Sequence, residues 1–131
     1  MTIATQDIQT IQNMSAVGVC LLDEKGLITY ANQYELENLG FRKGEYVGHH
    51  ISEFHLEEMV FNDMMTRLEE GETLRNYPAK VQGKYGIVYL LLDCSKQFEA
   101  GKFSHIRFCT FSVGKEAFEV LRRHSTYRLT D

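Results

Sequence analysis

The sequence predicts an α+β domain in which short helices cover one face of a five-stranded antiparallel sheet, with a further helix near each end. Three observations lead to this prediction. A turn at residues 23–26 separates two strand-like runs, and apolar residues recur at helical spacing over residues 56–70. After Gly71 the chain consists of strand-like runs joined by short connections. Helices gathered on one face of an antiparallel sheet are the α+β arrangement.

The N-terminal segment has the pattern of a short amphipathic helix. Its apolar residues Ile8, Ile11 and Met14 recur at near-helical spacing, which predicts a helix over residues 5–14. A helix of this length is not stable by itself in water. We therefore expect it to pack against this domain or against a second copy of the chain.

A β-hairpin and two short helices are predicted next. Residues 17–22 and 27–31 are strand-like, and Gly26 suits the positive-φ position of the loop between them. Asn32 is a suitable N-cap for a helix over residues 34–39, which Gly40 would end. A further helical turn is expected around residues 44–47.

The best helix of the sequence covers residues 56–70. Val60, Met64 and Leu68 recur every four residues, which places them on one face, and Gly71 follows as a stop signal. This face is predicted to lie against the sheet.

The remaining strands are predicted at residues 73–81, 86–95 and 103–113, with residues 82–85 and 96–102 as connections. Pro78 lies within the first of these runs. Because proline has no N–H to donate to a neighbouring strand, we expect this strand at an edge of the sheet. A last helix is expected over residues 115–124, with Phe118 and Leu121 on one side.

Composition favours a single cytoplasmic domain. The chain has 131 residues, of which 44% are hydrophobic and 24% charged, enough apolar material for one core. Its net charge of −4 and scattered basic residues argue against nucleic-acid binding. Three cysteines without a C-x-x-C spacing predict a reducing compartment rather than disulfides or a zinc site. No signal peptide or membrane span is predicted, since the longest apolar run covers only residues 87–92.

The sequence also resembles a known family, the PAS domains of sensor kinases. The resemblance rests on the order and spacing of five segments, followed by residues 49–55 and Gly71-Glu72. The segments are Ser15-Ala16-Val17-Gly18-Val19, Asp23-Glu24-Lys25-Gly26, Ile28-Thr29-Tyr30-Ala31-Asn32, Leu39-Gly40-Phe41 and Glu45-Tyr46-Val47-Gly48.

The resemblance implies a sheet in the spatial order 2-1-5-4-3, with short helices closing over one face to form a small pocket. It divides the chain into an N-terminal helix at residues 1–14, a PAS domain at residues 15–113 and a C-terminal helix and tail at residues 114–131. Many PAS domains end the last strand with Asp-x-Thr, where this chain has Ser112-Val113-Gly114. This departure affects the contact that usually couples the sheet to an output helix.

The implied function is a non-enzymatic sensory module of a signalling protein, for example of a two-component system. Such a module binds a small ligand or a partner protein and forms homodimers, either as an input domain or as a standalone regulator. The segment with Ile8, Ile11 and Met14 is the candidate dimer contact, because it can cover apolar residues on the outer face of the sheet.

Candidate pocket residues are apolar side chains predicted on the helix-covered face of the sheet. They are Tyr30, Phe54, Val60, Met64, Leu68, Leu90, Leu92, Ile106 and Phe108. The same residues would equally form a filled core, because protein interiors are normally close-packed. The sequence leaves both alternatives open.

Specific chemistry finds little support in the sequence. Metal binding by the group around His49, His50, Glu53 and His55 lacks the spacing of known motifs. The resemblance argues against haem, since the long helix has no histidine, and against a flavin photosensor, since all three cysteines fall in predicted strands. We therefore expect no cofactor.

An alternative function is a small α+β enzyme or a carrier of an apolar small molecule. It would use Asp93, the one carboxylate within an apolar strand, with a histidine such as His105 as an acid–base pair. The simpler interpretation of Asp93 is a hydrogen-bonded or outward-facing strand residue.

Overall fold

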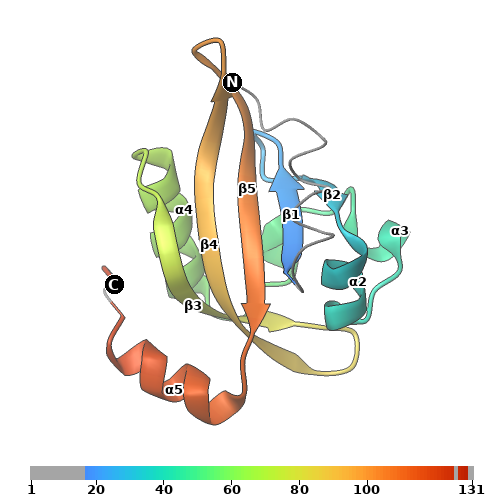
Figure 1. The fold of residues 1–131 in the computed structure, drawn as a ribbon, viewed down its shortest axis with the longest axis vertical. Coiled ribbons are helices and arrows are strands. Elements are labelled where there is room, and N and C mark those ends of the chain that lie inside the picture. Colours follow the sequence, from blue (N-terminus) through green and yellow to red (C-terminus); the bar gives the residue numbers. More distant parts are fainter. Residues whose placement is uncertain (1–16, 126, 130–131) are drawn as a thin grey trace.

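A computed structural model describes residues 17–125 and 127–129, and its sheet confirms the predicted fold class and strand order. Five antiparallel strands lie in the order β2-β1-β5-β4-β3 (Figure 1). The strands are β1 (Gly18–Leu22), β2 (Ile28–Ala31), β3 (Leu74–Gln82), β4 (Ile87–Glu99) and β5 (Lys102–Ser112). The helices are α2 (Gln33–Leu39), α3 (Lys43–Tyr46), η1 (Ile51–Glu53), α4 (Glu58–Glu69) and α5 (Lys115–Arg123).

Two expectations from the sequence concerned an N-terminal helix and the absence of a membrane span. The helix expected over residues 5–14, with Ile8, Ile11 and Met14, lies outside the described residues. None of the helices that the structure does describe is long and apolar enough to cross a membrane.

The hairpin of β1 and β2 closes as predicted. The Asp23 carboxylate accepts hydrogen bonds from the N–H groups of Lys25 and Leu27, both at 2.9 Å. Gly26 has a φ of 88°, a left-handed conformation that glycine adopts without steric cost. His50 donates from Nε2 to the Lys25 carbonyl at 2.8 Å, which ties the turn to the segment before η1.

Asn32 joins β1 to α2. Its side-chain oxygen accepts from the N–H of Glu35, as an N-cap does, and from the N–H of Val19. Its amide nitrogen donates to the Val17 carbonyl. Gly40, with a φ of 82°, ends α2 in the left-handed conformation. Both predicted caps are therefore present.

The core lies between the helices and one face of the sheet. Val60, Met64 and Leu68 of α4 are buried, as the four-residue spacing predicts. They belong to the same cluster as Leu90, Leu92, Cys94, Ile106 and Phe108 of the central strands. The even-numbered residues at positions 90–94 and 106–110 therefore face the helices, and the odd-numbered residues between them face the other way.

β3 is an edge strand, as Pro78 predicts. Its outer edge is covered by the chain itself. The N–H of Leu56 donates to the Lys80 carbonyl, and the N–H of Gln82 donates to the Phe54 carbonyl. Because exposed strand edges recruit other strands, this cover protects the sheet from unwanted pairing.

The connection predicted at residues 96–102 is wrong. β4 continues to Glu99 and β5 begins at Lys102, so only Ala100 and Gly101 form the turn. Residues 95–99 are polar apart from Phe98, and they form a strand because β5 pairs with them. Figure 1 shows this hairpin projecting beyond the rest of the sheet.

α5 covers part of the outer face of the sheet. Phe118 is fully buried, and its ring lies 5.1 Å from the ring of Tyr89 on β4. Leu121, predicted on the same buried side, is largely exposed. Figure 1 shows α5 turning from the end of β5 toward β3, and beyond it Tyr127 binds the Pro78 carbonyl of β3 and Arg128 pairs with Glu70 after α4.

Replacing Met64 by alanine is expected to lower the free energy of unfolding by about 2–5 kcal/mol, because the side chain is fully buried and its removal leaves a cavity. Met59 on the same helix is 43% exposed, and Met59→Ala should change this free energy by about 0.5 kcal/mol or less. Urea denaturation measures both. Equal losses in the two variants would contradict the assignment of α4's buried face.

Candidate functional site

A small cavity lies between the sheet and the short helices. Its volume is about 20 Å³, which is room for about one water molecule. The lining is mostly apolar with a few polar groups: Cys20, Glu35, Leu39, Tyr46, Ile51, Phe54, His55, Val81, Leu90, Leu92, Phe108 and Thr110. A mainly apolar cavity with a few convergent polar side chains is the usual form of a small-molecule site.

The Glu35 carboxylate is the most unusual group of this cavity. Glu35 is only 1% exposed, although it is a charged residue type. Thr110 donates to Oε1 at 2.6 Å, and the Tyr46 hydroxyl donates to Oε2 at 2.9 Å. The Tyr46 hydroxyl also lies 3.7 Å from the Cys20 sulfur. These bonds connect α2, the end of α3 and the central strands β1 and β5.

The backbone around Glu35 is built for this close approach. A Cβ atom at Gly18 would lie 2.5 Å from Glu35 Oε1 and would overlap Thr110 Oγ1. Any side chain at this position would therefore push the carboxylate out of its place. Asn32 holds the first turn of α2 against β1 from the other side.

Burial controls the protonation of this cluster. It raises the pKa of Glu35, although the hydrogen bonds from Thr110 and Tyr46 act in the opposite direction. Burial also raises the pKa of the Cys20 thiol well above its ordinary value, and that of Tyr46 likewise. Cys20 therefore stays a protonated thiol at neutral pH and is a poor nucleophile.

His55 also lines the cavity and forms a β-bridge with Val81 of β3. Burial lowers the pKa of its imidazole to about 4, so the ring is neutral at neutral pH. The ring packs against Phe61 of α4, with the ring centres 4.9 Å apart. The cavity therefore has no positively charged side chain among its lining residues.

The structure brings some of the candidate pocket residues together and separates others. Phe54, Leu90, Leu92 and Phe108 line the cavity. The other buried candidates belong to the surrounding core without reaching the cavity: Val60, Met64, Leu68 and Ile106. Tyr30 pairs with Leu21 and is half-buried on the outer face of the sheet.

The polar residues of the cavity were not among the candidates drawn from the sequence. Glu35 does carry a signal, because it lies one helical turn before Leu39 and so on the buried face of α2. Thr110 follows Ile106 and Phe108 at the spacing of a strand's inner face. Polar residues at core positions of two separate elements are the pattern that identifies such a cluster.

The histidines around η1 have structural roles. His50 Nδ1 accepts from the N–H of Ser52, while the N–H of His50 donates to Glu53, which together cap η1. His49 Nδ1 lies 3.3 Å from the Glu53 carboxylate. Among the described residues, no group of three or more His, Cys, Asp or Glu side chains is placed to hold a metal ion.

Asp93 and His105 are not brought together. Asp93 pairs with Cys109 across the strands, whereas His105 pairs with Gln97. The two are four residue pairs apart, or about 13 Å along the strands. The Asp93 carboxylate instead accepts from the N–H of Asn76 at 2.8 Å, which matches the simpler interpretation of this residue.

The C-terminal segment, which consists of α5 and the described residues after it, 124–125 and 127–129, docks beside the cavity wall. Arg122 of α5 forms an ion pair with Glu57 at 2.5 Å, two residues after His55. The Tyr127 ring meets the Tyr77 ring edge-on at 5.2 Å, and its hydroxyl donates to the Pro78 carbonyl at 2.5 Å. The segment therefore contacts both the edge strand β3 and the residue before α4.

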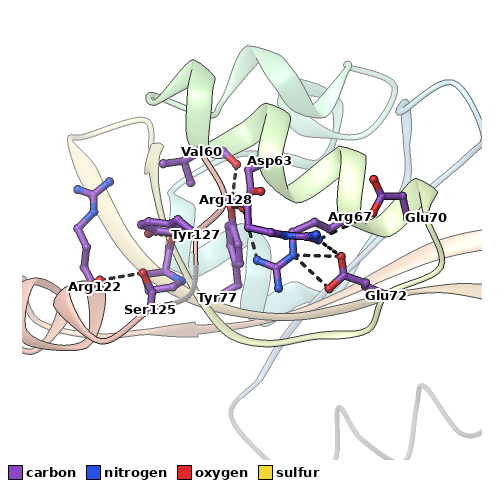
Figure 2. Close-up of polar contacts among 11 residues, drawn as sticks. Val60, Asp63, Arg67, Glu70, Glu72, Tyr77, Arg122, Ser125, Tyr127 and Arg128 are labelled. Carbon is purple, nitrogen blue, oxygen red and sulfur yellow. Dashed lines mark hydrogen bonds and ion pairs between the residues drawn. The ribbon is translucent and has the colours of Figure 1, made fainter. Parts of the chain in front are cut away.

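Tyr77 is the centre of a second polar network (Figure 2). Its hydroxyl donates to the Val60 carbonyl at 2.9 Å and to the buried Asp63 carboxylate at 2.7 Å. Arg67 pairs with Asp63 and with Glu72, and its guanidinium lies over the Tyr77 ring. Figure 2 shows Tyr77 between Tyr127 and Arg67. Burial raises the pKa of Tyr77, so its hydroxyl stays protonated.

Comparison with known proteins places this arrangement in a family. A family model described as PAS fold matches residues 6–110. A search of curated proteins finds no match.

Three similar solved structures share the fold. A light-oxygen-voltage domain studied with a flavin analogue has a TM-score of 0.80 at 15% identity, covering 93% of this chain and 95% of its own. The PAS domain of an HTR-like protein from Haloarcula marismortui has a TM-score of 0.66 at 19% identity, covering 83% and 91%. The Drosophila melanogaster Cycle W398A PAS-B domain with bound glycerol has a TM-score of 0.63 at 12% identity, covering 73% and 99%. At such identities the likeness extends to the fold alone.

Glu35→Gln is expected to change how stability depends on pH. Burial raises the pKa of Glu35 above its ordinary value of 4.5, so the protonated carboxyl favours the native state. This contribution is present below the ordinary pKa and is lost as pH rises through the folded pKa. The variant does not titrate there. Its free energy of unfolding, relative to the wild type, should therefore increase as pH rises from 4.5 toward neutrality.

Urea denaturation at a series of pH values measures this difference. Glu37→Gln is the matched control, because it makes the same exchange at an exposed position on the same helix, and its difference from the wild type should not reproduce the rise expected for Glu35→Gln. A flat or falling difference for Glu35→Gln would rule out a raised pKa at this site.

Proposed function

This chain belongs to the PAS fold family, and from that premise we propose that it is a non-enzymatic sensory module in which the internal cavity receives the signal and the C-terminal segment passes it on. The signal is a small uncharged polar molecule. The module serves either as the input domain of a signalling protein or as a standalone regulator with a protein partner.

The polar cluster of the cavity is the observation that carries this proposal. Glu35, Tyr46 and Thr110 form a hydrogen-bonding surface within an otherwise apolar lining. An uncharged polar molecule suits this surface, because the lining has no cationic side chain for an anion, and burial raises the pKa of Glu35 and so disfavours the carboxylate that a cation would need. The cavity holds about one water molecule, so a larger ligand enters by displacing lining side chains.

The segment at residues 54–57 links the cavity to the C-terminal segment. Phe54 and His55 line the cavity, and Glu57 pairs with Arg122 of α5. A ligand that displaces Phe54 or His55 therefore moves the partner of Arg122. This contact takes the place of the coupling that Asp-x-Thr provides elsewhere, since Ser112-Val113-Gly114 lies at the end of the last strand here.

Cavity chemistry supports a module without catalysis. The Cys20 thiol is protonated, and Asp93 lies about 13 Å along the strands from His105. A flavin would have to displace far more of the lining side chains than a small polar molecule does. A cavity of about 20 Å³ is far smaller than the roughly 300–1,000 Å³ of drug-sized ligand sites. The expectation of a colourless protein without haem or flavin stays a prediction.

Glycerol, which is bound in the Cycle PAS-B structure, is a suitable small polar probe. In an NMR titration of the whole chain, glycerol is expected to shift the backbone amides around the cavity, and those of α5 through the Glu57–Arg122 pair. In Arg122→Gln the shifts around the cavity should persist and those of α5 should disappear.

Arg123→Gln is the control for this experiment, because Arg123 is the exposed neighbour of Arg122 and no ion pair of its side chain is found among the described residues. It should behave like the wild type. Shifts confined to surface residues would contradict the cavity as the binding site. Unchanged α5 shifts in Arg122→Gln would contradict the proposed route of transmission.

We also propose that the module forms a homodimer through its N-terminal segment. The outer face of the sheet offers apolar side chains for such a contact, and α5 covers only the part near Tyr89. Leu21, Leu91, Cys109 and Phe111 are half-buried on that face. The residues proposed to cover it are Ile8, Ile11 and Met14, whose apolar side chains recur at helical spacing.

Light scattering on the intact chain and on a version without residues 1–14 tests the dimer. The intact chain should have twice the mass of one chain at micromolar concentration, and the shortened version should be monomeric. A monomeric intact chain would refute the dimer, and two dimeric forms would place the contact elsewhere.

A further inference from the structure

A second hollow lies on the surface, between the first half of β3 and the end of α5. Its volume is about 330 Å³, within the usual range of roughly 300–1,000 Å³ for small-molecule sites. We call it the β3–α5 groove. It is separate from the internal cavity, since the two have no lining residue in common.

The charge of the β3–α5 groove is one-sided. Arg67 of α4, Arg75 of β3 and His124 at the end of α5 all line it, and none of its described lining residues is acidic. Arg67 is held in place by Asp63 and Glu72, which neutralise part of its charge. Within the described residues the Arg75 guanidinium has no ion pair, and the exposed His124 imidazole lies at the end of α5.

Neutral polar groups complete this rim. Thr73 and Asn76 supply a hydroxyl and an amide to the groove, whereas the Ser125 hydroxyl at its edge already donates to the Arg122 carbonyl. The apolar surface of the groove comes mainly from Leu121, which is 40% exposed, because the side chain of Pro78 beside it is buried. A basic and polar rim beside an apolar wall is complementary to a molecule with one anionic end and one apolar body.

An irregularity in β3 exposes the basic rim. The register of β3 and β4 shifts between Leu74 and Tyr77, although the side chains of both residues are buried. One extra residue therefore lies between them, and both Arg75 and Asn76 are exposed. Asn76 has a φ of 51°, which non-glycine residues rarely adopt, and the bond from its N–H to Asp93 holds it there.

We propose that the β3–α5 groove binds a small organic phosphate monoester. Guanidinium groups bind phosphate oxygens through paired N–H donors, and hydroxyl and amide groups satisfy the remaining oxygens. The phosphate lies against Arg75 and His124, near the less exposed Arg67, and the organic group lies against Leu121. Free phosphate and a phosphate ester differ at this apolar surface, because only the ester has an organic group that contacts it.

Binding in the groove is linked to the docking of the C-terminal segment. Leu121, His124 and Ser125 come from that segment, so the groove is complete only when the segment is docked. A ligand that binds only the docked form stabilises that form. The phosphate ester therefore holds α5 and Tyr127 against β3.

Adenosine monophosphate is the probe for a test on the whole chain, with adenosine and inorganic phosphate compared at constant ionic strength. Calorimetry should detect the monophosphate in the wild type, weaker binding of inorganic phosphate and none of adenosine. Arg75→Gln should lower the affinity for the monophosphate about tenfold or more, because a charge-assisted hydrogen bond is lost. Arg123→Gln, an exposed change outside the groove on α5, should alter the affinity for the monophosphate by about twofold or less.

Hydrogen exchange of the α5 amides tests the linkage, and exchange should slow when the monophosphate is added. The proposal is overturned if the monophosphate does not bind at millimolar concentration, or if adenosine binds equally well. Equal losses in Arg75→Gln and Arg123→Gln would reveal unspecific surface attraction. If inorganic phosphate bound as tightly as the ester, the apolar surface would have no role in binding. If hydrogen exchange in α5 did not change, binding would not be linked to the docking of α5.

Discussion

The burial of the Glu35 carboxylate is the constraint on which the helix-covered side of this domain depends. A carboxylate away from water is costly unless donors satisfy it. Its donors here come from the central strand β5 through Thr110 and from the end of α3 through Tyr46. Satisfying Glu35 therefore positions α2 and α3 over the sheet, requires glycine at position 18, and leaves a polar wall in an apolar core. The cavity is a consequence of this arrangement.

A second constraint is the edge of β3, which the chain must cover to avoid pairing with other strands. Residues 54–56 cover one part of it with backbone hydrogen bonds, and Tyr127 covers another by binding the Pro78 carbonyl. The first cover carries Phe54 and His55 into the cavity, and the second holds the C-terminal segment in place. Both covers lie along the same edge of the sheet. The ion pair between Glu57 and Arg122 therefore joins the segment that lines the cavity to the C-terminal segment.

Features with local causes could be predicted from the sequence, and features with distant causes could not. The turn at Gly26, the N-cap at Asn32 and the buried face of α4 depend on neighbouring residues, so their patterns are visible in the sequence. The extension of β4 through residues 96–99 depends on pairing with β5, and no local signal marks it. Glu35 meets Thr110 across 75 residues and Tyr127 meets Pro78 across 49. Four apolar residues of the cavity, Phe54, Leu90, Leu92 and Phe108, were therefore among the candidates drawn from the sequence, and its polar residues and the docked C-terminal segment were not.

The internal cavity and the β3–α5 groove act on the same element if both proposals hold. A ligand in the cavity changes the position of Glu57 and so the docking of α5, while an anion in the groove stabilises that docking. Two ligands that bias one equilibrium must change each other's affinity by the same factor. A cavity ligand that loosens α5 would therefore weaken the binding of the anion, and the anion would weaken the binding of the cavity ligand by the same factor. The C-terminal segment then reports the balance of two signals, which a cavity with a freely extended output helix could not do.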